Sequence, residues 1–279
     1  MTVTVVGIGL IGGSFALALK DKGLANRVIG VDSQEEHKKK ALALRLVDDV
    51  KELAEAVKES ELIFLAVPVD AASKMLPSIL DMVDKQVVMD AGSTKEGIVD
   101  AVKDHPKRGR FVATHPMWGT EYSGPDAAVR GAFEGKATVI CNEDESDEDA
   151  VDIVENIYRQ LGMHLVYMNA HDHDVHVAYV SHISHITSFA LANTVLEKEK
   201  EEDAIFELAS GGFESTVRLA KSNPLTWASI FMQNKENVLD VLNEHISQLR
   251  KFKACLEKEN YDYLEELMVN ANKIKRIIK

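Results

Sequence analysis

The sequence VTVVGIGLIGGS, residues 3–14, joins a short apolar, β-branched run to three glycines, Gly7, Gly9 and Gly12. The run predicts a buried strand that ends at Gly7 and continues as a helix from about Leu10. In this G-x-G-x-x-G spacing the first glycine permits a tight turn, the second lets phosphates approach the backbone, and the third lets the helix pack closely on the strand. The helix N-terminus would then face a pyrophosphate. The stretch therefore predicts a dinucleotide-binding turn and not merely a glycine-rich loop.

A second predicted strand, RVIGVD, ends in Asp32 at the distance from the glycines that this motif requires. A carboxylate there can accept hydrogen bonds from the ribose hydroxyls of NAD and would repel the extra phosphate of NADP. Lysines at 38–40 could meet that phosphate instead, or form a solvated helix face. NAD is thus the expected cofactor and NADP the alternative. The cofactor-binding candidates are Gly7, Gly9, Leu10, Ile11, Gly12, Asp32, Val67 and Pro68.

Composition limits the classes of protein that need to be considered. The chain has 279 residues, 46% of them hydrophobic, which is enough for two domains. A net charge of -13 argues against nucleic-acid or anionic-membrane partners, because these are bound through accumulated Lys and Arg. The apolar runs are too short to span a bilayer, so we expect neither a membrane-spanning helix nor a signal peptide. With only Cys141 and Cys255, we expect a cytoplasmic protein without a disulfide framework.

The chain changes character near residue 168. Before it, apolar strand candidates alternate with amphipathic segments at 11–22, 34–45, 50–59, 70–80, 95–103 and 147–161. This alternation predicts an α/β fold with a doubly wound parallel sheet of the Rossmann type. After residue 170 only patterns of helical period remain. We therefore expect a nucleotide-binding domain at 1–168 and an all-helical domain at 169–279.

A long helix is expected near the C-terminus. Asn223 before Pro224 is typical of a helix start. A mostly apolar stripe follows at alternating four- and three-residue steps: Trp227, Phe231, Asn234, Val238, Leu242, His245, Leu249, Phe252 and Leu256. At 1.5 Å per residue this stripe predicts one helix of roughly 45 Å, longer than a small domain needs for its own core. A homodimer through the helical domain is the expected explanation. The alternative is a helix that lies across its own N-terminal domain.

Two segments place polar residues directly after strand candidates. Substrates of doubly wound sheets bind at the carboxyl ends of the strands. Ser93 follows QVVMDAG, and His115 follows RFVAT. A neutral histidine can accept the hydroxyl proton that must leave when a carbinol carbon loses a hydride. We therefore expect His115 to be the catalytic base beside a nicotinamide, although a lone loop histidine can also be structural.

The segment HDHDVHVAYVSHISH, residues 171–185, is rich in histidine. On one regular helix His182 and His185 would face a different side from His173 and His176, so one metal ion could not gather all four. We predict no metal site and expect His182 and His185 to bind an anionic or carbonyl-bearing substrate. Arg218 could form paired hydrogen bonds to a carboxylate, or else a surface salt bridge.

The chain resembles the prephenate/arogenate dehydrogenase family over essentially its whole length. The resemblance rests on GIGLIGGS, DAGSTK, HPMWGTEYSGP, SHISH and GGFESTVRLAKSNPLTW in this order. It implies a Rossmann domain with a helical dimerisation domain, and NAD-dependent oxidative decarboxylation of prephenate to 4-hydroxyphenylpyruvate in tyrosine biosynthesis. Arogenate is the alternative substrate. A β-hydroxyacid dehydrogenase, which needs a lysine where this chain has histidines, and a dinucleotide sensor without turnover are more distant alternatives.

The resemblance also implies roles for individual residues. His115 would accept the proton of the ring hydroxyl, with Ser93 as its polar neighbour. Arg218 would bind a carboxylate of the dianionic substrate, and His182 and His185 would contact the substrate's side chain. Glu121 would shape the pocket and His173 would lie near it. Trp227 would pack close by, from this subunit or its partner. The bulky Trp118 in HPMWGTE is expected to reshape the pocket entrance.

Overall fold

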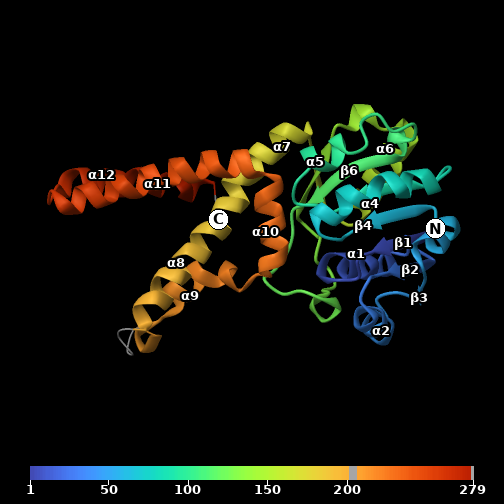
Figure 1. The fold of residues 1–279 in the computed structure, drawn as a ribbon, viewed down its shortest axis with the longest axis horizontal. Coiled ribbons are helices and arrows are strands. Elements are labelled where there is room, and N and C mark those ends of the chain that lie inside the picture. Colours follow the sequence, from blue (N-terminus) through green and yellow to red (C-terminus); the bar gives the residue numbers. More distant parts are fainter. Residues whose placement is uncertain (201–205, 278–279) are drawn as a thin grey trace. The chain divides into compact units, whose positions relative to one another are not determined.

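One mostly parallel sheet organises the N-terminal part of the chain (Figure 1). The computed structural model describes residues 1–200 and 206–277. In spatial order the strands of the sheet are β3 (Asp49–Val50), β2 (Arg27–Val31), β1 (Thr2–Val6), β4 (Leu62–Leu65), β5 (Val87–Asp90), β6 (Phe111–Pro116), β7 (Ala137–Cys141) and β8 (His164–Met168). The seven apolar runs that were strand candidates each form a strand: VTVVG, RVIGVD, LIFLAVPV, QVVMDAG, RFVATHP, ATVIC and MHLVYM. The two-residue β3 is an addition.

The central strands are buried because helices cover both faces of the sheet. β4 and β5 are buried at every position. Leu62 and Phe64 join the hydrophobic core on one face, whereas Ile63 and Leu65 join the core on the other. Continuous apolar runs are typical of parallel strands that are enclosed in this way. The predicted Rossmann fold class is therefore confirmed.

The sheet differs from the prediction at one pair of strands. β6 and β7 are antiparallel, with His115 opposite Val139, while every other neighbouring pair is parallel. Parallel neighbours need a crossover, usually a helix. The connection from residue 117 to 136 contains only the short 3-10 turn Pro125–Ala127. The chain therefore returns in the opposite direction, and the expectation of an entirely parallel sheet was wrong here.

Six helices connect the strands where amphipathic segments were expected. They are α1 (Leu10–Asp21), α2 (Glu35–Ala43), α3 (Leu53–Glu59), α4 (Val69–Met82), α5 (Glu96–Asp100) and α6 (Glu148–Gln160). α5 is shorter than the predicted 95–103. Its N-terminus directly follows the segment that carries Ser93, which places that residue at the end of β5.

The described residues after β8 are helical, as predicted. The helices are α7 (Ala170–Val177), α8 (Ile183–Glu199), α9 (Gly211–Val217), α10 (Pro224–Gln233), α11 (Lys235–Glu257) and α12 (Tyr261–Ala271). The single helix predicted from Trp227 to Leu256 was wrong, because it is interrupted between α10 and α11 at Asn234. The Asn234 side chain is buried, and its Nδ2 donates to Asp174 O.

Two compact units make up the chain, Met1–Asn234 and Lys235–Lys279. The first contains the whole sheet together with α7 to α10, and the second contains α11 and α12. The domain limits expected from the sequence, 1–168 and 169–279, stay a prediction. Among the described helices, none has the length and hydropathy needed to cross a membrane.

Candidate active site

The glycine turn joins β1 to α1 at the carboxyl edge of the sheet. Gly7 has a φ of 90°, and a Cβ on it would lie 2.5 Å from Ala66 O, so only glycine fits. A Cβ on Gly12 would collide with Gly7 O, which explains how closely the helix packs. Gly9, by contrast, faces open space up to 4.0 Å, and no side chain caps α1 there. The first N-H groups of the helix are thus left for a ligand.

Asp32 lies just beyond β2, beside this turn. Its carboxylate accepts hydrogen bonds from Ile8 N at 3.0 Å and Gln34 N at 2.9 Å. His37 Nδ1 lies 3.4 Å from the same carboxylate. The other predicted cofactor contacts also adjoin the turn or the neighbouring strand. Leu10 and Ile11 begin α1, Val67 lies against Gly7, and Pro68 precedes α4.

A buried ion pair fixes the segment that carries Ser93. Lys95 Nζ binds the Asp90 carboxylate, and neither side chain is exposed to solvent. The same carboxylate accepts Gly92 N at 2.8 Å and Thr114 N at 3.0 Å. Ser93 is half-buried between these anchored positions. The end of β5 and the end of β6, where His115 lies, are therefore held together by one carboxylate.

His115 is the penultimate residue of β6, inside the strand rather than after it as expected. Its Nδ1 lies 2.9 Å from His173 Nε2, and His173 Nδ1 lies 2.7 Å from Asp174 Oδ1. Burial, reinforced by the charges of His173, Lys95 and His182, lowers the pKa of His115 well below the ordinary histidine value. His115 is therefore neutral at physiological pH and able to accept a proton.

A π-helical turn, Ala178–His182, connects α7 with α8. On a regular helix His173 and His182 would lie about 180° apart, but the wider turn changes their relative orientation and both side chains are buried. The premise of one regular helix was therefore wrong. Asn234 Nδ2 lies 3.2 Å from His182 Nδ1. Because an amide nitrogen donates, His182 Nδ1 is the acceptor and its proton resides on the buried Nε2, which has no partner within the described structure.

His185 and Trp227 form a stacked pair across α8 and α10. Their ring centroids are 3.3 Å apart and their planes are inclined by 22°. His185 Nδ1 donates to Ser181 O at 3.1 Å, which leaves Nε2 as an acceptor. Burial lowers the pKa of both His182 and His185 to about 4. Both side chains therefore act as neutral groups, not as cations.

Glu121 and Arg218 form an ion pair of 2.7 Å near this cluster. Arg218 is half exposed, whereas the Glu121 side chain is largely covered. Burial is the main cause of the lowered pKa of His185, and the charge of Arg218 adds to it. Trp118 packs its ring against Phe133, with 5.6 Å between centroids.

Within residues 1–200 and 206–277, no three histidine, cysteine, aspartate or glutamate side chains are arranged to hold a metal ion.

Sequence reasoning missed several residues that hold this site together. Asp174 accepts Lys95 N at 2.7 Å and Glu96 N at 3.0 Å, besides its contact with His173. Asn234 donates to Asp174 O at 2.7 Å. Asp174 follows His173 directly in the sequence, which is the signal that could have found it. Asn234 is, with His245, a polar residue in a mostly apolar stripe, and a buried amide needs hydrogen-bond partners, which is the signal that could have found it.

Comparison with known proteins agrees with this architecture. Residues 15–167 match the family model described as the nucleotide-binding domain of prephenate dehydrogenase, and residues 169–270 match the model of its dimerization domain. The chain belongs to the prephenate dehydrogenase family. It is therefore a dehydrogenase with a Rossmann-type nucleotide-binding domain, and the resemblance inferred from the motifs is confirmed.

Individual members of the prephenate dehydrogenase family match nearly the whole chain. A prephenate dehydrogenase of Bacillus subtilis is 33% identical over 94% of this chain and 72% of its own length. The crystal structure of prephenate dehydrogenase from A. aeolicus, in complex with hydroxyphenyl propionate and NAD+, has a TM-score of 0.87 at 29% identity, covering 99% of this chain and 97% of that one. An arogenate dehydrogenase of Synechocystis has a TM-score of 0.78 at 26% identity, with both chains fully covered.

Proposed function

We propose that this enzyme oxidatively decarboxylates prephenate to 4-hydroxyphenylpyruvate and carbon dioxide, with reduction of NAD, in tyrosine biosynthesis. The observation that carries the proposal is the contact between His115 Nδ1 and His173 Nε2 at 2.9 Å. It occupies one ring nitrogen of a buried, neutral histidine at the carboxyl edge of the sheet. The other nitrogen, Nε2, is left to accept the proton of a substrate hydroxyl.

NAD is the cofactor of this enzyme. The glycine turn fits its pyrophosphate, because Gly9 leaves open space in front of uncapped helical N-H groups. Asp32, already oriented by Ile8 N and Gln34 N, has the charge to bind a ribose diol and to disfavour a phosphate in its place. The chemistry that NAD supplies when bound is acceptance of a hydride.

The chain's own residues supply the proton transfers. His115 Nε2 takes the proton from the C4 hydroxyl as C4 loses its hydride and becomes a carbonyl carbon. The bond from C1 to the ring carboxylate then breaks, its electron pair moves through the ring to the oxygen, and carbon dioxide leaves. The phenolate recovers the proton from His115, so no net proton is released. Ser93, at the end of β5, is the polar neighbour that orients the hydroxyl.

The remaining cluster suits the two carboxylates of prephenate. Arg218 is a half-exposed cation whose partner, Glu121, can be exchanged for a substrate carboxylate. His182 offers a buried Nε2 proton as a neutral donor, and Trp227 stacked on His185 provides an apolar wall. These groups explain how a chain with a net charge of -13 binds a dianion.

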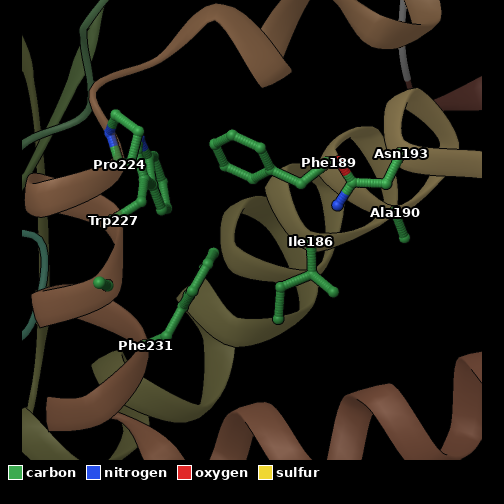
Figure 2. Close-up of a pocket in the computed structure, with 8 residues that line it drawn as sticks. Ile186, Phe189, Ala190, Asn193, Pro224, Trp227 and Phe231 are labelled. Atoms are coloured by element: carbon green, nitrogen blue, oxygen red, sulfur yellow. The ribbon is translucent and has the colours of Figure 1, made fainter. Parts of the chain in front are cut away.

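A homodimer through the helical domain is part of the proposal. An apolar groove between α8 and α10 is open to solvent, and Figure 2 shows Phe189 and Ile186 facing Trp227 and Phe231 across it. Exposed apolar grooves of this kind are typical of interaction sites. The match to the family's dimerization domain supports a second copy of the chain as the occupant.

A cytoplasmic location is also proposed, because both cysteines are free thiols.

The test is NADH formation by the purified protein with prephenate or arogenate, each with NAD or NADP. We expect the highest kcat/KM with prephenate and NAD. Arogenate differs in carrying an amino group in place of the keto group, and the Glu121 carboxylate is the side chain that could favour it. Higher kcat/KM with arogenate would replace the proposed substrate, and no turnover of either compound would overturn the proposal.

A further inference from the structure

Three buried side chains form a hydrogen-bonded row behind the proposed base. His115 Nδ1 contacts His173 Nε2 at 2.9 Å, and His173 Nδ1 contacts Asp174 Oδ1 at 2.7 Å. His173 and Asp174 are each 1% exposed and His115 is 9% exposed. The row begins on β6 and ends on α7, so it crosses from the sheet to the first helix after it.

The chemistry of the groups fixes the direction of these hydrogen bonds. An ionised carboxylate only accepts, so His173 Nδ1 must carry a proton and donate it to Asp174. A neutral His173 then has a lone pair on Nε2, which can only accept from His115 Nδ1. The proton of neutral His115 is therefore on Nδ1, and its Nε2 is bare.

The opposite direction requires His173 to be doubly protonated. Burial is the main influence on His173 and lowers its pKa, although the Asp174 hydrogen bond opposes this shift. Lys95 further disfavours a cation at His173, and with His182 it disfavours one at His115. At neutral pH His115 Nδ1 therefore donates to His173 Nε2, and His173 Nδ1 donates to Asp174.

Asp174 itself is held rigidly. Besides His173, its carboxylate accepts Lys95 N at 2.7 Å and Glu96 N at 3.0 Å, both at the start of α5. Its backbone carbonyl accepts Asn234 Nδ2 at 2.7 Å. The start of α5 and the end of α10 thus hold Asp174 of α7 in place. Its carboxylate oxygens cannot turn away from His173 without breaking buried hydrogen bonds.

We propose that Asp174, acting through His173, is a positioning residue that holds His115 in the Nδ1-H tautomer and so presents Nε2 as the proton acceptor. The proposal deepens the proposed function and rests on it. The same hydrogen bonds stabilise the cation that forms on His115 after proton transfer. His115 Nδ1-H then donates to His173, which itself donates to the negatively charged Asp174.

Paired substitutions of His173 separate this role from packing. Phenylalanine fills the ring volume but accepts no hydrogen bond, whereas the glutamine side-chain carbonyl can accept from His115 Nδ1. We expect His173→Phe to lower kcat by about 10²-fold or more with a smaller change in KM, in line with the 10²–10⁴-fold typical of general base catalysis. His173→Gln should retain at least several-fold more activity than His173→Phe. His176→Phe, at an exposed position of the same helix, is the matched control and should resemble the unaltered enzyme.

Nitrogen-15 NMR of imidazole-labelled protein tests the tautomer without relying on turnover, with His115→Asn used to assign the signal. We expect His115 in the Nδ1-H form, and a mixed or Nε2-H form in His173→Phe and in Asp174→Asn. An Nε2-H signal in the unaltered protein, or His173→Phe as active as His173→Gln, would overturn the inference. If neither prephenate nor arogenate is turned over, the proposed function fails while the NMR result still decides the tautomer. Circular dichroism and NAD titration identify variants that do not fold, and His173→Gln keeps the test open if His173→Phe is one of them.

Discussion

Glu121 Oε2 and Arg218 Nη1 lie 2.7 Å apart, which links the segment after β6 to the helical turn that follows α9. The pair contributes to a lowered pKa of Glu121, after a larger effect of its own backbone N-H. Arg218 thus already has a carboxylate partner. In the proposed function, a substrate carboxylate takes the place of Glu121 at Arg218.

Replacement of Arg218 should therefore weaken substrate binding more than catalysis. We expect Arg218→Ala to raise KM for prephenate by about 10- to 100-fold, since hydrogen bonds to charged groups are worth about 1.5–3 kcal/mol. Steady-state kinetics measure the change. Arg159→Ala, which removes an exposed arginine from α6, is the control and should leave KM unchanged. An unchanged KM in Arg218→Ala would remove this residue from the proposed site.

Asp32 should decide the choice between NAD and NADP. In Asp32→Ser the negative charge that repels a 2'-phosphate is gone, so the ratio of kcat/KM for NAD over NADP should fall by about tenfold or more, equivalent to about 1.4 kcal/mol. Initial rates with both cofactors measure the ratio. Glu36→Ser removes an equal charge from the neighbouring helix and should change the ratio little. A similar fall in both variants would assign the preference to overall charge and not to Asp32.

The apolar groove between α8 and α10 predicts how to dissociate the proposed dimer. Phe189→Glu places a charge in a surface that would be desolvated by the second copy, so the dimer should separate into monomers. Sedimentation velocity over a range of concentrations measures the mass. Glu197→Gln, at an exposed position near the C-terminal end of α8, serves as a control that should remain dimeric. A dimeric Phe189→Glu protein would place the interface elsewhere.

Buried neutral histidines predict a loss of stability in mild acid. Burial lowers the pKa of His182 and His185 to about 4, whereas in the unfolded chain histidines bind protons near pH 6.5. Between these values the unfolded state holds more protons than the folded state, so the free energy of unfolding falls as the pH falls. Urea unfolding from about pH 7 to about pH 5 should show this slope. His185→Gln should make it shallower, unlike His164→Gln on the exposed side of β8; equal slopes in the two variants would contradict the assignment.

Local patterns predicted most of the fold. Apolar runs such as LIFL of β4 and the glycine spacing of residues 7–12 reflect burial and backbone geometry that the sequence itself determines. The antiparallel return of β7 was missed because it depends on the lack of a crossover helix, not on the strand's own residues. The break at Asn234 was missed because helical period continues through it, while a tertiary hydrogen bond to Asp174 draws its side chain inward.

The candidate site was predictable where topology alone brings residues together. Ser93 follows β5 and His115 lies at the end of the neighbouring β6, so strand order places both at the carboxyl edge of the sheet. Asp174 and Asn234 were not predictable in this way, because their contacts depend on side-chain directions on α7 and at the end of α10. Such second-layer partners have no fixed spacing in the sequence.

The central claim is that His115 accepts the substrate proton, and His115→Asn tests it most directly. Asparagine keeps a polar side chain of similar reach but cannot serve as a base. Parallel measurements of prephenate-dependent NADH formation and of NAD binding should show kcat reduced by about 10²–10⁴-fold or more, with NAD affinity unchanged. Turnover close to that of the unaltered enzyme, with NAD still bound, would contradict the assignment of His115 as the base.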